Sequence, residues 1–391
     1  MNQRELFFNH VAQTSPAPLA LEIVKAEGAE LIDSKDKKYI DLIGGISVAN
    51  VGHRHPKVVE AIKRQLDDYL HIMVYGEFIE SPQVQYAKLL TDHLPGHLNS
   101  VYFTNSGAEA VEGAMKLAKR FTTRVGIIAF NNSYHGSTQG ALSIFGSEEW
   151  RNAYRPLLPG ILHFNYNSAE VIDAIDENIA CVIMEPVQAE AGIIAASEEW
   201  LKAVRKRCDE TGTLLIFDEI QTGFGRTGKL WGFENFDVVP DVLLLGKALG
   251  GGMPLGAFIA SREMMNSLAN NPVLGHITTF GGHPVCCAAG MAAMQVLLEE
   301  NMMEEVKVKE QLFLSNLQHK KIKTTRSFGL WLAVEFENFE MNKAVIDRCI
   351  EQGVLTDWFL FANNCIRISP ALTLNLEQIQ FACDTIISCC H

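Results

Sequence analysis

The sequence predicts an α/β protein in which a large domain with a mainly parallel sheet is joined to a smaller α+β domain. From Val101 onward, short apolar runs alternate with helical stretches. This alternation implies crossover connections between parallel strands. After Pro284 the pattern changes to a long helical stretch, followed by an antiparallel-looking strand, a helix, a strand and a last helix. This second pattern predicts the smaller domain.

We expect three parts along the chain. Residues 1–48 form an N-terminal segment that packs with the small domain, residues 49–284 form the large α/β domain, and residues 285–391 form the small one. The N-terminal segment reads as a short helix, a proline-rich link and three strands near residues 22–25, 30–33 and 39–42. Pro56 opens a helix whose inward face we predict to carry Val59, Ile62, Leu66 and Tyr69.

The central strands are predicted from apolar runs bounded by turn residues. In the large domain they span residues 101–104, 125–130, 180–184, 213–217 and 242–245. A helix rich in Ala, Glu and Lys follows the first of them, over residues 108–121. In the small domain we expect strands over residues 330–336 and 365–369.

Composition limits the classes of function. The chain has 391 residues, of which 48% are hydrophobic and 20% charged, so a sizeable core is available. A formal charge of −13 argues against a nucleic-acid partner. No run approaches the ~18–20 apolar residues of a membrane helix, and the N-terminus lacks the apolar core of a signal peptide. We therefore expect a cytoplasmic protein without a membrane partner.

Cysteine and histidine patterns predict no metal site. The nine cysteines are irregularly spaced and odd in number, which argues against a disulfide framework. The pair Cys286-Cys287 is interpreted as reduced thiols buried in a helix. His53 and His55 are followed by Pro56 without a carboxylate ligand pattern, which favours a turn with hydrogen-bonded histidines.

Two predicted strands end in residues that can carry chemistry. The run 213–217 ends at Asp218, and the run 242–245 ends at Gly246-Lys247 before three glycines. Open α/β sheets bind ligands at the carboxyl ends of their strands. Burial there favours the neutral amine of Lys247. Together these residues suggest the pairing of pyridoxal phosphate enzymes, in which the lysine forms a Schiff base and the aspartate holds a ring nitrogen protonated.

Each of these residues also has an ordinary structural interpretation. A lysine after a strand is commonly a solvated loop residue, and an aspartate there is commonly a turn former or N-cap. Ser106 and Gly107 lie between a strand and a helix, where backbone N–H groups can hold a phosphate. Ser106 with Glu109 also matches a capping box. The G-x-G-x-x-G at residues 223–228 fits a dinucleotide site poorly, because no small-residue helix follows it.

Six motifs together resemble the class III aminotransferases, a branch of the fold-type I pyridoxal phosphate enzymes, over nearly the whole chain. They are GGISVANVGHRHP, NSGAEAVEGAMKLAK, EPVQAEAG, IFDEIQTGFGRTGKLWGFE, LLLGKALGGGMPLGA and TTFGGHP. The EPVQAEAG and DEIQTG motifs are most similar to those of the acetylornithine aminotransferase group.

The resemblance implies a role for each cofactor-binding position. Lys247 would be the Schiff-base lysine and the acid and base of the proton shift, and Asp218 would pair with the ring nitrogen. Gln221 would hydrogen-bond the phenolic oxygen of pyridoxal 5'-phosphate, and Ile220 and Tyr134 would sandwich its ring. The phosphate would be held by Ser106, Gly107 and Ala108. Thr279 would reach the phosphate in the partner subunit, which implies a homodimer.

The resemblance also implies how substrates are bound. Arg367 would grip a substrate carboxylate, as a planar guanidinium can, and Glu190 would pair with it when an ω-amine end is presented. Glu185 is interpreted as a structural carboxylate. Where related enzymes carry an arginine for a carboxylate, this chain has Ser137. A lost charge-assisted contact costs about 1.5–3 kcal/mol.

These residues predict an aminotransferase (EC 2.6.1.-) that uses 2-oxoglutarate as the amino acceptor. The first candidate donor is N-acetylornithine or a related ω-amino acid. The alternative, kept open by Ser137, is another ω-amine, such as 4-aminobutyrate, ornithine, lysine or a diamine-derived acid. From other classes of function we considered a non-catalytic dimer that binds pyridoxal phosphate, and an NAD oxidoreductase. The joint presence of Lys247, Asp218 and Arg367 argues against both.

Overall fold

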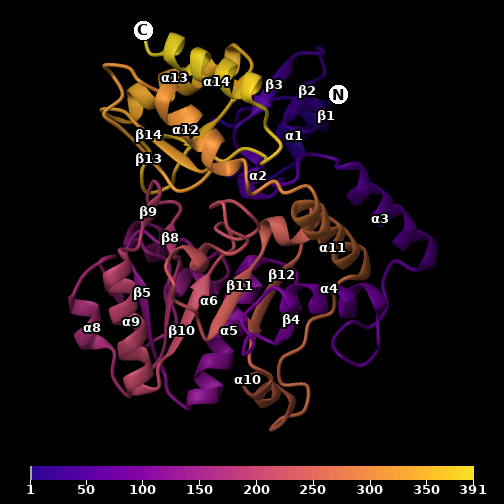
Figure 1. Ribbon diagram of the computed structural model, residues 1–391, viewed down its shortest axis with the longest axis vertical. Helices are drawn as coiled ribbons and strands as arrows, with labels where there is room; N and C mark the ends of the chain where they lie inside the picture. The colour runs from indigo at the N-terminus through magenta and orange to yellow at the C-terminus, as the bar shows by residue number, and fades with distance from the viewer. Residues whose placement is uncertain (1) are drawn as a thin grey trace.

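The computed structural model describes residues 2–391, which form two lobes with a seven-stranded sheet in the larger one (Figure 1). The strand order is β4-β12-β11-β10-β7-β5-β6. Neighbours from β11 to β6 pair in parallel, whereas β12 runs antiparallel to both β11 and β4. The predicted α/β class with a mainly parallel sheet is confirmed. The strands are β4 (Ser100–Thr104), β5 (Gly126–Phe130), β6 (Ile161–Phe164), β7 (Ile179–Met184), β10 (Leu214–Asp218), β11 (Val242–Leu245) and β12 (Gly256–Ala260).

The central strands are apolar along their whole length because both faces of the sheet are covered. Ile216 and Leu244 pack in the core on the side of α5 (Gly107–Thr122). Their neighbours Phe217 and Leu245 pack in the main core with residues of α9 (Glu198–Thr211) and α11 (Pro284–Glu299). Consecutive residues of a strand point to opposite faces, so one short run supplies both cores and fixes where its last residue lies.

Helix α11 connects the large sheet to the helices that precede it in the chain. It contacts α3 (Pro56–Asp68), α4 (Ser81–Asp92) and the 3-10 helix η3 (Lys247–Gly250). The predicted inner face of α3 is right only for Ile62, which packs against the core. The buried residues of α3 are Val58, Ala61 and Gln65, and Leu66 is 47% exposed. The buried face carries Ala61, a residue small enough to let two helices approach closely. Cys286 and Cys287 are buried in α11, as predicted.

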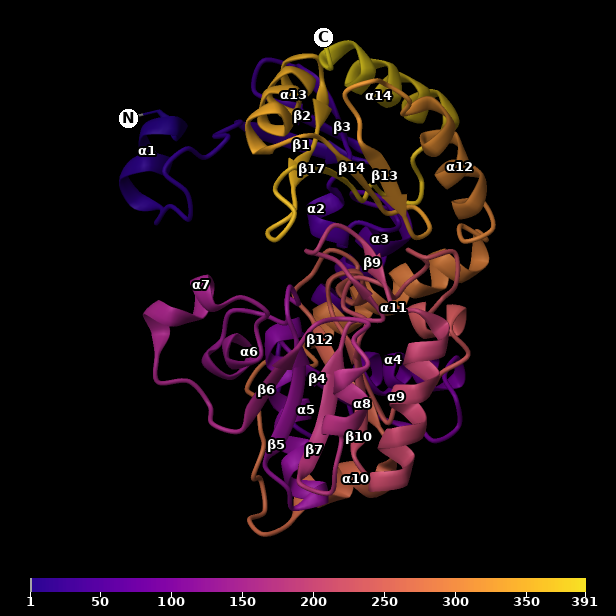
Figure 2. The same ribbon diagram turned by 90° about the vertical axis from the view of Figure 1, so that its left-hand side faces the viewer.

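The smaller lobe contains two four-stranded sheets with helices beside them (Figures 1 and 2). One sheet has the antiparallel order β13-β14-β17-β16, and the other has the order β1-β2-β3-β15. Ile40 of β3 pairs with Val354 of β15, so the N-terminal strands join the C-terminal part of the chain. The boundaries at residues 48 and 284 stay a prediction. The first sheet contains β13 (Thr324–Ser327), β14 (Leu332–Glu335), β17 (Cys365–Ile368) and β16 (Asp357–Trp358).

The remaining elements of this lobe come from both ends of the chain. They are β1 (Ile23–Glu27), β2 (Glu30–Asp33), β3 (Lys38–Asp41), β15 (Val354–Leu355), α12 (Val306–Asn316), α13 (Phe339–Glu351) and α14 (Leu376–Cys389). The first helix, α1 (Gln3–His10), has no buried residue and projects to one side in Figure 2. Within residues 2–391, no helix has the length and apolar character needed to span a bilayer.

Candidate active site

A cavity of about 470 Å³ opens at the carboxyl end of the parallel strands. Its walls are built from five chain segments at the ends of β4, β5, β7, β10 and β11. Eight predicted cofactor residues line it together, namely Ser106, Gly107, Ala108, Tyr134, Asp218, Ile220, Gln221 and Lys247. Ser137, His135 and Glu185 also line the cavity. These residues are spread over positions 106 to 247 of the sequence. They meet at the cavity because the strands that carry them lie in the same sheet.

Lys247 begins η3 directly after β11 and has a left-handed backbone with φ of +48°. This conformation is costly for a residue other than glycine and is found mainly at functional sites. The pKa of the Lys247 amine is lowered from 10.5 to about 8, chiefly by burial and also by the charge of Arg367. The carboxylates of Glu190 and Asp218 oppose the shift. A reactive neutral amine is therefore accessible near neutral pH.

Asp218 is the last residue of β10 and is 4% exposed. Its Oδ2 lies 2.7 Å from Nδ1 of His135, and its Oδ1 accepts a 3.0 Å hydrogen bond from the backbone N–H of Ile220. Burial alone lowers the pKa of His135, but the Asp218 bond and the charges of Asp218 and Glu185 raise it overall. These two contacts fix the orientation of the Asp218 side chain in the cavity lining.

His135 is a site residue that the sequence interpretation missed. It follows the predicted ring-stacking residue Tyr134 in the Tyr-His-Gly-Ser stretch, and a buried histidine next to a site residue was the signal available. Its side chain is buried, and Nε2 has no hydrogen-bond partner among the described residues.

Glu185, for which a structural role was predicted, lines the cavity and accepts two backbone hydrogen bonds. Its Oε1 accepts from the backbone N–H of Tyr134 at 3.2 Å, and its Oε2 accepts from that of Ala189 at 2.9 Å. Burial raises the pKa of Glu185 to about 7. The side chain therefore ties the tyrosine loop to the loop that carries Glu190.

The turn before α5 has the form expected of an anion site. Ser106 is the N-cap, and its Oγ accepts from the backbone N–H of Glu109 at 3.2 Å. The Glu109 carboxylate does not return to Ser106 but accepts from Asn105, so only half of the capping box forms. A Cβ at Gly107 would lie 2.6 Å from Cδ1 of Ile220. The glycine lets the helix start and the Ile220 side chain approach closely.

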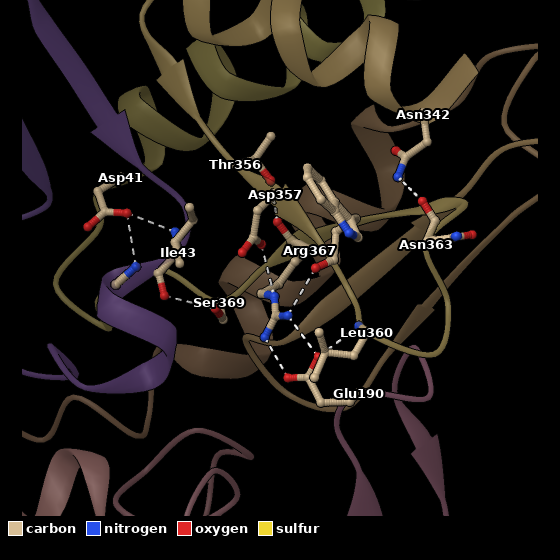
Figure 3. A network of polar contacts seen from close by, with 12 residues as sticks. Asp41, Ile43, Glu190, Asn342, Thr356, Asp357, Leu360, Asn363, Arg367 and Ser369 are labelled. Atoms are coloured by element: carbon tan, nitrogen blue, oxygen red, sulfur yellow. Dashed lines mark hydrogen bonds and ion pairs between the residues drawn. The ribbon is translucent and has the colours of Figure 1, made fainter. Parts of the chain in front are cut away.

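Arg367 and Glu190 form a buried pair (Figure 3), and neither residue is part of the cavity lining. Two hydrogen bonds of 2.9 Å join the guanidinium to the two carboxylate oxygens. Arg367 also donates to the carbonyl of Trp358 at 3.0 Å, and its Nε lies 2.9 Å from the Asp357 carboxylate. Burial disfavours the ionised Glu190, but Arg367 holds its pKa below the usual value. The pair is charged and bidentate.

Thr279 is exposed and lies outside the cavity lining of this chain. Its neighbour Thr278 accepts a 3.0 Å hydrogen bond from Asn105, which anchors the segment to the turn before α5. Within the described residues, no cluster of His, Cys, Asp or Glu could hold a metal ion.

The cavity residues fit pyridoxal phosphate. Oε1 of Gln221 is buried without a hydrogen-bond partner among the described residues, and a polar atom left in this way calls for a ligand group. The N-terminus of α5 offers backbone N–H groups for a phosphate. Lys247 supplies a weakly basic amine and Asp218 a fixed carboxylate. Gln221 was predicted to hydrogen-bond the phenolic oxygen of the cofactor. That oxygen accepts a hydrogen bond, and the amide nitrogen of Gln221 can donate it.

The chain belongs to the class-III aminotransferases, which are enzymes dependent on pyridoxal phosphate. Residues 11–390 match the aminotransferase class-III family. The chain is 40% identical to an acetylornithine aminotransferase of Methanopyrus kandleri, over 98% of this chain and 97% of the relative. It is 37% identical to another from Caldanaerobacter subterraneus, with 92% of each chain covered.

A solved structure agrees with this assignment. The chain matches an ornithine aminotransferase from Toxoplasma gondii with a TM-score of 0.91 and 30% identity, covering 99% of this chain and 93% of that one. The predicted family, fold and cofactor are thereby confirmed. The roles of individual site residues remain proposals.

Proposed function

We propose that this enzyme moves the amino group of a primary ω-amine to 2-oxoglutarate. The donor R–CH2–NH2 leaves as the aldehyde R–CHO, and 2-oxoglutarate leaves as glutamate. The observation that carries this proposal is the Glu190–Arg367 pair, because one bidentate site then serves two kinds of substrate. With Glu190 in place, the guanidinium is covered. With Glu190 displaced, Arg367 can bind a carboxylate of the keto acid.

Pyridoxal phosphate supplies the electron sink for the exchange when it is bound. The protein supplies proton transfer through Nζ of Lys247, which takes a proton from the donor carbon and later returns one. An acid–base group works best when its pKa lies near the working pH, and the lowered pKa of Lys247, about 8, meets that condition.

The groups around Lys247 orient the reaction. Asp218, oriented by His135, would face a ring nitrogen of the cofactor and keep it protonated. Tyr134 and Ile220, which line the cavity, would flank the ring, and Glu185 fixes the Tyr134 backbone. Ser106, Gly107 and Ala108 would hold the phosphate.

Two classes of donor remain candidates. N-acetylornithine or a related ω-amino acid is supported by the two curated relatives. Another ω-amine, among them 4-aminobutyrate, ornithine, lysine or a diamine-derived acid, is supported by Ser137, which leaves this wall of the cavity without a guanidinium.

We also propose a homodimer in which Thr279 contributes to the partner's site. Thr279 is exposed, and its neighbours Ile277 and Phe280 are 51% and 54% exposed. Apolar side chains gathered in this way mark an interface. Light scattering that gives a monomer would contradict the dimer. In a true dimer, Thr279→Ala should weaken retention of pyridoxal phosphate.

The function is tested by incubating the enzyme with each candidate amine and 2-oxoglutarate, and by measuring glutamate and aldehyde. Equal amounts of both products are expected with at least one ω-amine. Lys247→Ala should abolish both. Formation of aldehyde without glutamate would contradict the proposal that 2-oxoglutarate is the acceptor. Absence of product with every ω-amine would contradict the proposed class of donor.

A further inference from the structure

One wall of the cavity is formed by Ser137 and Thr138, just before α6 (Gln139–Ser143). Behind this wall lies Glu112, a residue of α5 that the sequence interpretation did not single out. Oε1 of Glu112 accepts from Thr138 Oγ1 at 2.6 Å, from the Gly140 N–H at 2.8 Å and from the Ala141 N–H at 3.2 Å. The protein's own carboxylate thus occupies the backbone donors at the start of α6.

This arrangement leaves little at the wall that could bind a substrate carboxylate. Among the described residues that line the cavity, the one Lys or Arg side chain is Lys247, which the reaction itself uses. Arg367 is covered by Glu190 when an amine donor is bound. At Ser137 the available groups are neutral hydroxyls, since its Oγ lies 3.4 Å from the Tyr134 hydroxyl.

The charge of Glu112 at this wall also disfavours a donor that carries a carboxylate. A donor carboxylate next to Thr138 would face the Glu112 carboxylate with one side chain between them, and like charges at this range repel. An uncharged amide or a second ammonium group meets no such penalty. The wall therefore discriminates by charge.

We infer that the preferred donors are ω-amines that carry no carboxylate at this wall: terminal diamines and their N-acyl derivatives. This inference rests on the proposed function and narrows its donor class. The exchange keeps the same balance, in which a diamine or N-acyl diamine becomes the corresponding aminoaldehyde or amidoaldehyde and 2-oxoglutarate becomes glutamate.

The test compares pairs of donors that differ by one carboxylate. N-acetylornithine is set against N-acetyl-1,4-diaminobutane, ornithine against 1,4-diaminobutane, and lysine against 1,5-diaminopentane. The holoenzyme is mixed with each donor without keto acid, and the change in its visible absorbance gives an apparent Kd and a rate constant. We expect the member without the carboxylate to be favoured by roughly 10-fold or more in rate over Kd. A polar group that is buried without a partner is disfavoured by about 5- to 140-fold, and a charged one by more.

Two variants separate charge from size. Ser137→Arg should shift the ratio toward the acids by about 10-fold or more. Ser137→Gln adds bulk without charge and should not favour the acids. Equal or better use of the acids by the wild-type enzyme would overturn the inference, and so would an unchanged ratio in Ser137→Arg. In either case a spectral response to some ω-amine, reversed by 2-oxoglutarate, would leave the proposed function standing.

Discussion

Glu190 and Arg367, which are 177 residues apart in the chain, meet through two 2.9 Å hydrogen bonds. The backbone N–H of Leu360 donates to Glu190 Oε2 at 3.0 Å and holds the carboxylate in this orientation. Removing one partner of a buried pair leaves the other charge uncompensated. An anion that takes the place of Glu190 would therefore favour opening of the pair.

Glu190→Gln should ease the entry of 2-oxoglutarate, because the amide keeps the shape of the side chain but loses the charge that competes for Arg367. We expect the KM for 2-oxoglutarate to fall by about 10-fold, while the amine half-reaction slows. Separate measurement of the two half-reactions checks this. Glu335→Gln, which removes the partner of Arg326 in the same lobe, is the matched control. Equal rises in KM for both substrates would contradict a gating role.

His135→Asn should change how stability depends on pH. The pKa of His135 is raised overall in the folded protein, so its stabilising effect is fully present below the ordinary value of 6.5 and is lost as pH rises through the folded pKa. The slope is at most about 1.4 kcal/mol per pH unit. Burial also raises the pKa of Glu185 to about 7, while the charge of His135 lowers it, so the comparison is made with Glu185→Gln present in both proteins. Melting of the apoproteins from pH 6 upward should show a steeper decline in the protein that retains His135, and parallel curves would contradict the expected effect.

The strands and the cofactor cavity could be predicted because they depend on local patterns. Short apolar runs in the sequence predicted β4, β10 and β11. Asp218 is the last residue of β10, and Lys247 follows the end of β11 by two residues. In contrast, β6 and β12 were missed. Leu162 of β6 is 44% exposed, and β12 begins at Gly256 within a glycine-rich stretch, so neither resembles a buried strand.

Contacts between distant segments could not be predicted from pattern. His135 reaches Asp218 across 83 residues and Glu112 reaches the wall at Thr138 across 26. Neither spacing follows a helix or strand period. The Glu190–Arg367 pair was predicted only from the resemblance to a known family.

Arg226 illustrates the same limit and gives a stability prediction. The side chain is fully buried and donates 2.7 Å hydrogen bonds to the carbonyls of Leu330 and Pro370 and to Asn50 Oδ1. Arg226→Met leaves these three acceptors unpaired, at about 1–3 kcal/mol for each buried group. We expect a loss of at least about 3 kcal/mol in the free energy of unfolding, measured with denaturant. Arg226→Lys should lose less of the free energy of unfolding than Arg226→Met. A loss below about 1 kcal/mol in Arg226→Met would contradict this account.

Lys247 should react as an unusually acidic amine. In the apoprotein, labelling with an acylating reagent at a series of pH values should give a midpoint near the lowered pKa of about 8. Lys206, whose side chain is 79% exposed, serves as the internal comparison. Peptide mass spectrometry quantifies both sites in one sample. Equal midpoints would mean that burial does not shift the Lys247 amine.

The most direct test is the visible absorbance of the purified holoenzyme during sequential addition of substrates. We predict a band that Lys247→Ala abolishes, that an ω-amine bleaches without keto acid, and that 2-oxoglutarate restores. A band that persists in Lys247→Ala, or that no ω-amine changes, would contradict the central claim that Lys247 and the surrounding cavity carry out ω-amine transfer.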